Sequence, residues 1–230
     1  MNQGAQVLTP AGGGALAAQR NRVLRNTYWL LALSMVPTVL GAWIGVQTGI
    51  SQAMSPGIGL VVFLAGAFGF MFAIERTKNS AAGVPLLLAF TFFMGLMLAR
   101  LLGVVLGLSN GTGLVMTAFA GTGVIFLGMA TMSTVVKRDL TQMGKFLFIG
   151  MIMLLVAMIA NFFIQSGPLM ITLSVLAIGI FSLFILHDLK RVQDGVETNY
   201  ITATLGVYLS LYNVFSNLLA LLGIFGGNND

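Results

Sequence analysis

Apolar residues in this chain are gathered into seven long runs that are separated by short, more polar turns. The hydrocarbon core of a bilayer is about 30 Å thick, so a helix needs roughly 20 residues to cross it. Each run is about that long, and the pattern therefore predicts seven transmembrane helices. They are expected near residues 27–47, 57–75, 84–107, 113–136, 145–165, 168–187 and 200–224. The predicted fold is an all-α, polytopic membrane bundle over residues 27–225, with a flexible cytoplasmic tail at 1–26 and a short C-terminal tail at 226–230.

Positive charges appear only in every second gap between these runs. Lys and Arg in short loops are retained on the cytoplasmic side of a membrane, so the alternation predicts a cytoplasmic N-terminus and a C-terminus on the far side. Arg100, inside the third run, is the one basic residue of the eleven that does not follow this pattern. The other ten are Arg20, Arg22, Arg25, Arg76, Lys78, Lys137, Arg138, Lys145, Lys190 and Arg191. Residues 1–26 lack the short apolar core of a signal peptide, and we expect this tail to be retained.

Composition narrows the class of protein further. The chain is 57% hydrophobic and only 7% charged, with a mean hydropathy of +0.97, which argues against a soluble enzyme. Its net charge of +5 suits anionic lipid headgroups, and no nucleic-acid partner is expected because no basic stripe with interleaved aromatic residues is present. The absence of cysteine excludes disulfides and thiolate metal sites.

Small residues recur inside several runs, and in two of these runs they lie four residues apart. Such spacing lets membrane helices approach closely, so we expect these positions to pack within the bundle, with a dimer interface as the alternative. They are Gly41 with Gly45, Ala65 with Gly69, and Gly121, Gly123 and Gly128 in the fourth run.

Polar residues form a stripe along the last run, at steps of three or four. These positions share one helical face, which must be directed into the bundle because polar groups are costly in lipid. Two interpretations stay open: hydrogen bonds between helices, or a path for ions or protons. The stripe consists of Thr202, Gly206, Ser210, Asn213 and Asn217, with the hydroxyls of Tyr208 and Tyr212 nearby.

Two acidic residues, Glu75 and Asp188, lie at the cytoplasmic ends of the second and sixth runs. If they meet, they form a pair able to bind a cation or sense protons; alternatively, each is solvated beside Arg76 or Lys190. Arg100 lies roughly 24 Å along its helix, in the opposite leaflet, so we expect no salt bridge between Arg100 and Asp188. Arg100 is expected to extend outward or to bind backbone carbonyls.

Several membrane chemistries are excluded by missing residues. The last run has no lysine for a retinal Schiff base, and His187 is the only histidine, so neither an HExxH zinc site nor a serine protease site can be assembled. Glu75 and Asp188 also lack the sequence context of an aspartyl protease. We therefore expect no enzyme, no cofactor and no metal centre.

Motifs near both ends carry a resemblance to a known family. The segments GVETNYI at Gly195–Ile201 and YLSLYNVF at Tyr208–Phe215 resemble the C-terminal signature of the Bax inhibitor-1 family. VLRNTY at Val23–Tyr28 is similar to the same region of its bacterial inner-membrane, YccA-like branch. The resemblance implies seven helices arranged around a central one, and a role in modulating the membrane-anchored AAA+ protease FtsH.

Other members of this family are similar in having two aspartates, on the sixth and seventh helices, that gate a pH-sensitive calcium leak. By position, Asp188 corresponds to the first and Ser210 to the second. A hydroxyl can coordinate a cation but cannot share a proton with Asp188 as a second carboxylate would. The resemblance therefore implies a weakened calcium or proton site, for which Glu75 is a candidate replacement.

The sequence thus favours a regulatory inner-membrane protein that docks on the FtsH complex. Its N-terminal tail suggests a slow, competing substrate, because AAA+ motors grip exposed segments of this kind. The rival interpretation is a calcium or proton channel whose candidate residues are Asp188, Ser210, Glu75, Asn213 and Asn217. A small-solute exporter is a third interpretation.

Overall fold

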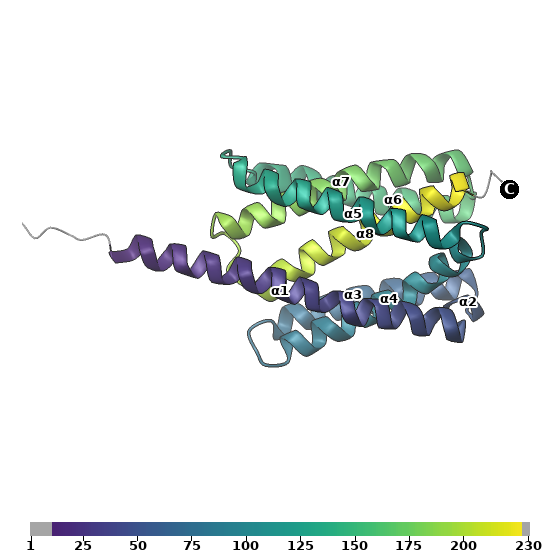
Figure 1. The fold of residues 1–230 in the computed structure, drawn as a ribbon, viewed down its shortest axis with the longest axis horizontal. Helices are drawn as coiled ribbons and strands as arrows, with labels where there is room; N and C mark the ends of the chain where they lie inside the picture. Colours follow the sequence, from purple (N-terminus) through teal and green to yellow (C-terminus); the bar gives the residue numbers. More distant parts are fainter. Residues whose placement is uncertain (1–10, 227–230) are drawn as a thin grey trace, which may run out of the picture.

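The computed structural model describes residues 11–226, which are helical almost throughout (Figure 1). Seven helices in this range are long and apolar enough to cross a membrane, which confirms the predicted number. The helices are α1 (Ala11–Thr48), α2 (Ile50–Ala53), α3 (Pro56–Thr77), α4 (Gly83–Leu106), α5 (Gly111–Val135), α6 (Thr141–Ile164), α7 (Gly167–Gln193) and α8 (Tyr200–Gly226). The four-residue helix α2 lies between the first and second spans and was not predicted.

Two helix starts follow from local sequence. Ser55 precedes α3 and Ser166 precedes α7, and each hydroxyl accepts a hydrogen bond from a backbone N–H in the first turn. A proline follows each serine in the first turn, where its missing N–H costs no helical hydrogen bond.

Two helices are longer than predicted. Helix α1 begins at Ala11, so residues 11–26 of the predicted flexible tail are helical, as their content of Ala, Gln and Arg favours. Residues 1–10 and 227–230 of the predicted tails lie outside the described part. Helix α7 continues to Gln193, beyond its predicted end at residue 187, because Leu189 and Val192 are completely buried and keep its last turns packed.

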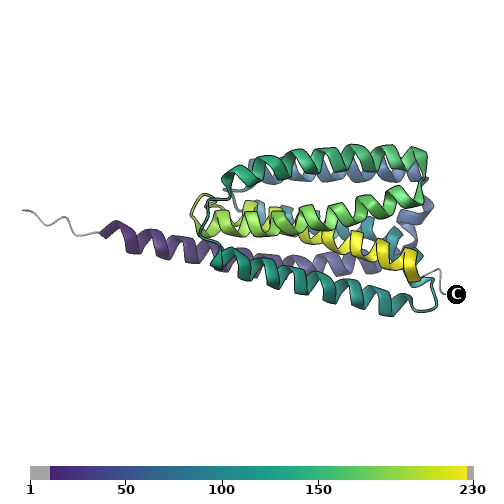
Figure 2. The ribbon, with the colours of Figure 1, turned by 90° about the horizontal axis from the view of Figure 1, so that it is seen from above.

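Helix α8 is the central helix of the bundle. It packs against α1, α4, α5 and α7, while α3 lies outside on α4 and α6 lies outside on α7. Figure 1 shows α8 running obliquely between a group formed by α1, α3 and α4 and a group formed by α5, α6 and α7, and Figure 2 shows the same bundle from above. This arrangement agrees with the central helix that the family resemblance implied.

The most extensive contact between two helices is that of α1 with α4, where glycines bring the two backbones together. A Cβ added at Gly41 would overlap the carbonyl oxygen of Phe92, and one at Gly45 would lie 3.1 Å from the carbonyl oxygen of Leu96. From the other side, a Cβ at Gly95 would overlap the carbonyl oxygen of Thr38. The predicted interior packing of the Gly41–Gly45 motif is therefore confirmed.

The other small-residue positions behave differently. Ala65 is exposed, and a Cβ added at Gly69, Gly123 or Gly128 would meet no atom within 4 Å. A Cβ added at Gly121 would lie 3.5 Å from the side chain of Leu218, an ordinary van der Waals contact. The prediction of interior packing is thus wrong for Ala65, Gly69, Gly123 and Gly128, because the faces that carry them point away from the neighbouring helices.

The loops that carry Lys and Arg gather at one end of the bundle, on the left in Figure 1. This basic end comprises the start of α1, the α3–α4 turn, the α5–α6 loop and the α7–α8 loop. The α1–α2, α4–α5 and α6–α7 connections lie at the opposite end. The fold thus separates the two sets of loops in the way that the charge alternation requires.

Candidate functional site

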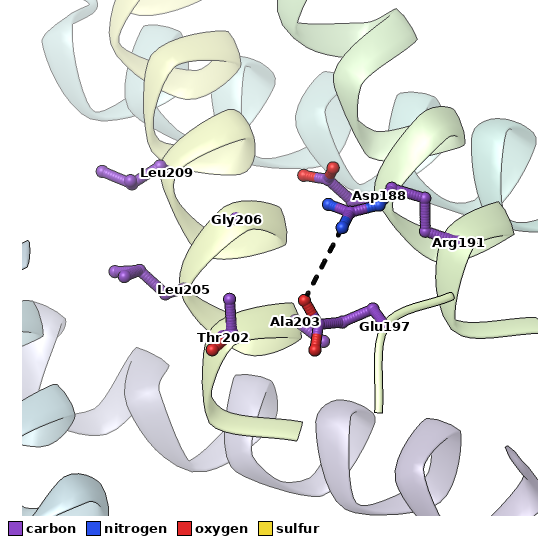
Figure 3. Close-up of a pocket in the computed structure, with 8 residues that line it drawn as sticks. All are labelled: Asp188, Arg191, Glu197, Thr202, Ala203, Leu205, Gly206 and Leu209. Carbon is purple, nitrogen blue, oxygen red and sulfur yellow. Dashed lines mark ion pairs between the residues drawn. The ribbon is translucent and has the colours of Figure 1, made fainter. Parts of the chain in front are cut away.

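A cavity of about 200 Å³ opens at the basic end, between the last turns of α7 and the first turns of α8 (Figure 3). Side chains of both signs reach it from α7 and from the α7–α8 loop, whereas α8 contributes a hydroxyl and apolar groups. The lining residues are Asp188, Arg191, Glu197, Thr202, Ala203, Leu205, Gly206 and Leu209.

The carboxylate of Asp188 lies directly against α8. A Cβ added at Gly206 would be 2.7 Å from Asp188 Oδ2, so only a glycine at this position lets the carboxylate approach so closely. The other oxygen, Oδ1, is 3.1 Å from His187 Nδ1 and accepts a hydrogen bond when that nitrogen is protonated. Asp188 is therefore held between its own helix and the centre of the bundle.

His187, the residue before Asp188 on α7, is buried. Its ring packs edge-on against Phe184, and a Cβ added at Gly144 of α6 would overlap Nε2. Helix α6 covers the ring, so the histidine supports Asp188 from inside the α6–α7 contact.

Arg191 and Glu197 complete the charged lining of the cavity. Arg191 Nη2 lies 3.9 Å from Glu197 Oε2, while Glu197 Oε1 accepts a 2.8 Å hydrogen bond from the backbone N–H of Asn199. With Asp188 included, the cavity has two carboxylates and one guanidinium. Its net negative charge suits a cation better than an anion, although the described residues contain no cluster of three or more His, Cys, Asp or Glu side chains for a metal ion.

Thr202, which lines this cavity, has an unusual polar atom behind the cavity wall. Its Oγ1 is buried and has no hydrogen-bond partner within the described range. An unsatisfied buried hydroxyl costs roughly 1–3 kcal/mol, so Thr202 is a locally unfavourable feature of the cavity wall.

Asn199 holds the loop that carries Glu197. Its Oδ1 caps α8 by accepting hydrogen bonds from the backbone N–H groups of Ile201 (2.9 Å) and Thr202 (3.2 Å). Its Nδ2 donates to the carbonyl oxygen of Lys78 (3.1 Å) and to Asn79 Oδ1 (2.9 Å) in the α3–α4 turn. One side chain thus joins the two groups of helices across the basic end.

The five candidate residues from the sequence are not gathered in one place. Only Asp188 lines the cavity, and Glu75 is exposed on α3, where it pairs with Lys78. Ser210 is buried one turn beyond Gly206 and donates to the carbonyl oxygen of Gly206 at 3.0 Å. Asn213 and Asn217 each donate at 2.8 Å to a carbonyl oxygen of α8 itself.

The polar stripe of α8 therefore bonds mostly within its own helix. Hydrogen bonds between helices come instead from two other hydroxyls of α8. Tyr208 Oη lies 2.9 Å from Thr38 Oγ1 of α1 and donates at 3.4 Å toward the carbonyl oxygen of Thr91 of α4. Thr204 Oγ1 lies 3.4 Å from the carbonyl oxygen of Thr27 of α1.

Arg191 and Glu197 were not among the candidate residues. Only the last turns of α7 and the fold of the α7–α8 loop bring them to the cavity. The motif around Glu197 was a signal for their importance, but it did not indicate their contacts.

Known proteins resemble this chain over almost its whole length. The family described as inhibitor of apoptosis-promoting Bax1 matches residues 20–228. A protein of Escherichia coli named modulator of FtsH protease YccA is 36% identical, covering 88% of this chain and 90% of its own. An uncharacterized membrane protein of Vibrio cholerae is also 36% identical, over 92% of this chain and 93% of its own.

The Asn199 contacts lead to a prediction about stability. Asn199→Ala removes the cap of α8 and the bond to the α3–α4 turn, and we expect it to lower the free energy of unfolding by about 1–2 kcal/mol. Thermal unfolding in detergent measures the loss, and hydrogen exchange should rise at the amides of Ile201 and Thr202. Asn110→Ala is the matched control, because Asn110 precedes α5 without making a side-chain capping bond. Equal effects of the two substitutions would contradict the assigned role.

Proposed function

The chain belongs to the Bax inhibitor-1 family, and from this membership we propose that it is a regulatory protein of the bacterial inner membrane that modulates an FtsH-type AAA+ protease. The observation that carries the proposal is the E. coli relative named as a modulator of FtsH, which aligns over nearly the full length of both chains. A second E. coli relative with the same coverage is named an inner membrane protein. The proposal includes no catalysis, since the family description and the name of the first of these relatives point to a regulatory membrane protein.

We further propose that the basic end faces the cytoplasm. Its support is the gathering of the Lys- and Arg-bearing loops at that end, because such loops are retained on the cytoplasmic side. ATP is cytoplasmic, so the motor of an AAA+ protease would meet the start of α1 and the basic loops. The lateral helix faces and these loops would then be the surfaces on which the protease complex docks.

The start of α1 supports the idea of a slow, competing substrate. Side chains from Leu16 to Arg22 are exposed, and Val23 is the first buried residue of α1 whose side chain is described. An isolated helix of this length is marginal in water, and Gly12, Gly13 and Gly14 weaken it further. A motor could therefore unfold and grip this segment without first opening the bundle.

Crosslinking and copurification from native membranes test the main proposal. We expect the tagged chain to recover an FtsH-type protease, and to do so several-fold better than an unrelated multispanning protein with the same tag. Recovery equal to that of the unrelated protein would refute a role at this protease.

Deletion of residues 1–18 tests the competing-substrate proposal. The deletion removes most of the exposed start of α1 but leaves Val23 and the bundle in place, so the lifetime of the protein in cells should lengthen. Pulse-chase labelling measures the lifetime, and deletion of residues 227–230 at the other end serves as the control. An unchanged lifetime after deletion of residues 1–18 would count against the proposal.

A pH-sensitive calcium or proton leak is the second candidate function. The cavity with Asp188 and Glu197 favours it, while the neutral hydroxyl of Ser210 weakens it. If the protein conducts, Asp188→Asn should abolish ion flux into liposomes that contain the purified protein. Glu75→Gln should leave the flux unchanged, because Glu75 is exposed and pairs with Lys78. Absence of flux in the wild-type protein would rule out this function.

A further inference from the structure

Arg100 is an intramembrane cation that no described carboxylate neutralises. It lies six residues before the end of α4 at Leu106, and its Nη1 donates a 3.3 Å hydrogen bond to the carbonyl oxygen of Met54. The ion pairs present among residues 11–226 do not include it. Five of the six acidic residues of the sequence lie at the basic end, and the sixth, Asp230, lies outside the described part.

The packing of α4 on α1 fixes the depth of Arg100 in the membrane. A Cβ added at Gly45 would lie against the side chain of Ala99, so Arg100 is level with this part of α1. Trp43, two residues from Gly45, is 61% exposed, and exposed tryptophans of membrane proteins gather at the boundary between hydrocarbon and headgroups. Arg100 therefore lies near the phosphate layer of the leaflet opposite the basic end.

The head of Arg100 adjoins a second positive centre. Its Nη1 would be 3.5 Å from a Cβ added at Gly59, in the first turn of α3. The N-terminal end of a helix has a partial positive charge and disfavours a cation beside it. An anion at this point would relieve the repulsion and use the guanidinium N–H groups that Met54 leaves free.

The surroundings of Arg100 face lipid. Helix α3 packs mainly on α4 alone, and Ile58, Val61 and Val104 on these two helices are more than half exposed. Acyl chains can lie along such an apolar surface, while a free anion cannot use it. A charge in these surroundings is costly unless an opposite charge meets it.

We propose that Arg100 binds the phosphate of a phospholipid in the leaflet opposite the basic end, with the acyl chains of that lipid along the outer faces of α3 and α4. The planar guanidinium can donate two parallel hydrogen bonds to phosphate oxygens, which a lysine cannot do. The lipid phosphate supplies the counter-charge that the described residues do not.

Native mass spectrometry of the detergent-purified protein, titrated with phosphatidylglycerol, tests this site. Arg100→Gln should weaken the tightest lipid-binding event by about tenfold, the effect of losing roughly one charge-assisted interaction. Arg25→Gln, an exposed arginine at the basic end, is the matched control and should leave that event unchanged. Asp230→Asn should also leave it unchanged. Equal affinities of the wild type and Arg100→Gln would overturn the proposal.

Two measurements keep the test decisive if Arg100→Gln does not fold. The wild-type protein should gain thermal stability from phosphatidylglycerol but not from diacylglycerol with the same acyl chains, since the latter lacks the phosphate. Arg100→Lys should retain part of the gain, because it keeps the charge and loses the planar fork. Stabilisation by inorganic phosphate alone to the same extent would show a free-anion site and refute the lipid site.

Discussion

Polar groups in a membrane must be satisfied inside the protein, and this constraint places α8 at the centre of the bundle. Its mean hydropathy of 1.6 is the lowest of the seven candidate spans, so it is the helix least able to face lipid. Its hydroxyls find partners on two other helices, Tyr208 on Thr38 and Thr91, and Thr204 on Thr27. The remaining helices can then present almost continuous apolar surfaces outward.

The position of α8 in turn produces the cavity at the basic end. Because α7 packs along α8 up to Val192, Asp188 is brought against Gly206 of α8, which has no side chain to exclude it. Asn199 caps the start of α8 and draws the preceding loop toward the α3–α4 turn, which brings Glu197 beside Arg191. The segment 195–201, which carries the family signature, therefore links the start of α8 to the α3–α4 turn and also contributes Glu197 to the cavity.

Two charged residues of the spans, Asp188 and Arg100, lie toward opposite ends of the bundle. Asp188 is held at the basic end by His187 and Gly206, whereas Arg100 lies toward the opposite end beside Met54. The two side chains cannot neutralise each other across the bundle, so each must be stabilised by its own surroundings. The carboxylate has a histidine and a cavity, and the guanidinium has a carbonyl oxygen and the lipid boundary.

By itself, the sequence determined the number of spans, the gathering of basic residues and the inward direction of the α8 stripe, since these depend on run length and local periodicity. It also indicated Asp188 as a candidate residue, and backbone carbonyls were one of the two environments expected for Arg100. Only the tertiary structure decided that Glu75 is exposed and pairs with Lys78, and that Glu197 lines the same cavity as Asp188. Both outcomes depend on how separate helices are rotated about their axes and on where a loop folds back. The same reason explains why Gly41 and Gly45 meet α4 while Gly69, Gly123 and Gly128 meet nothing: a small residue allows close packing only where a neighbouring helix covers its face.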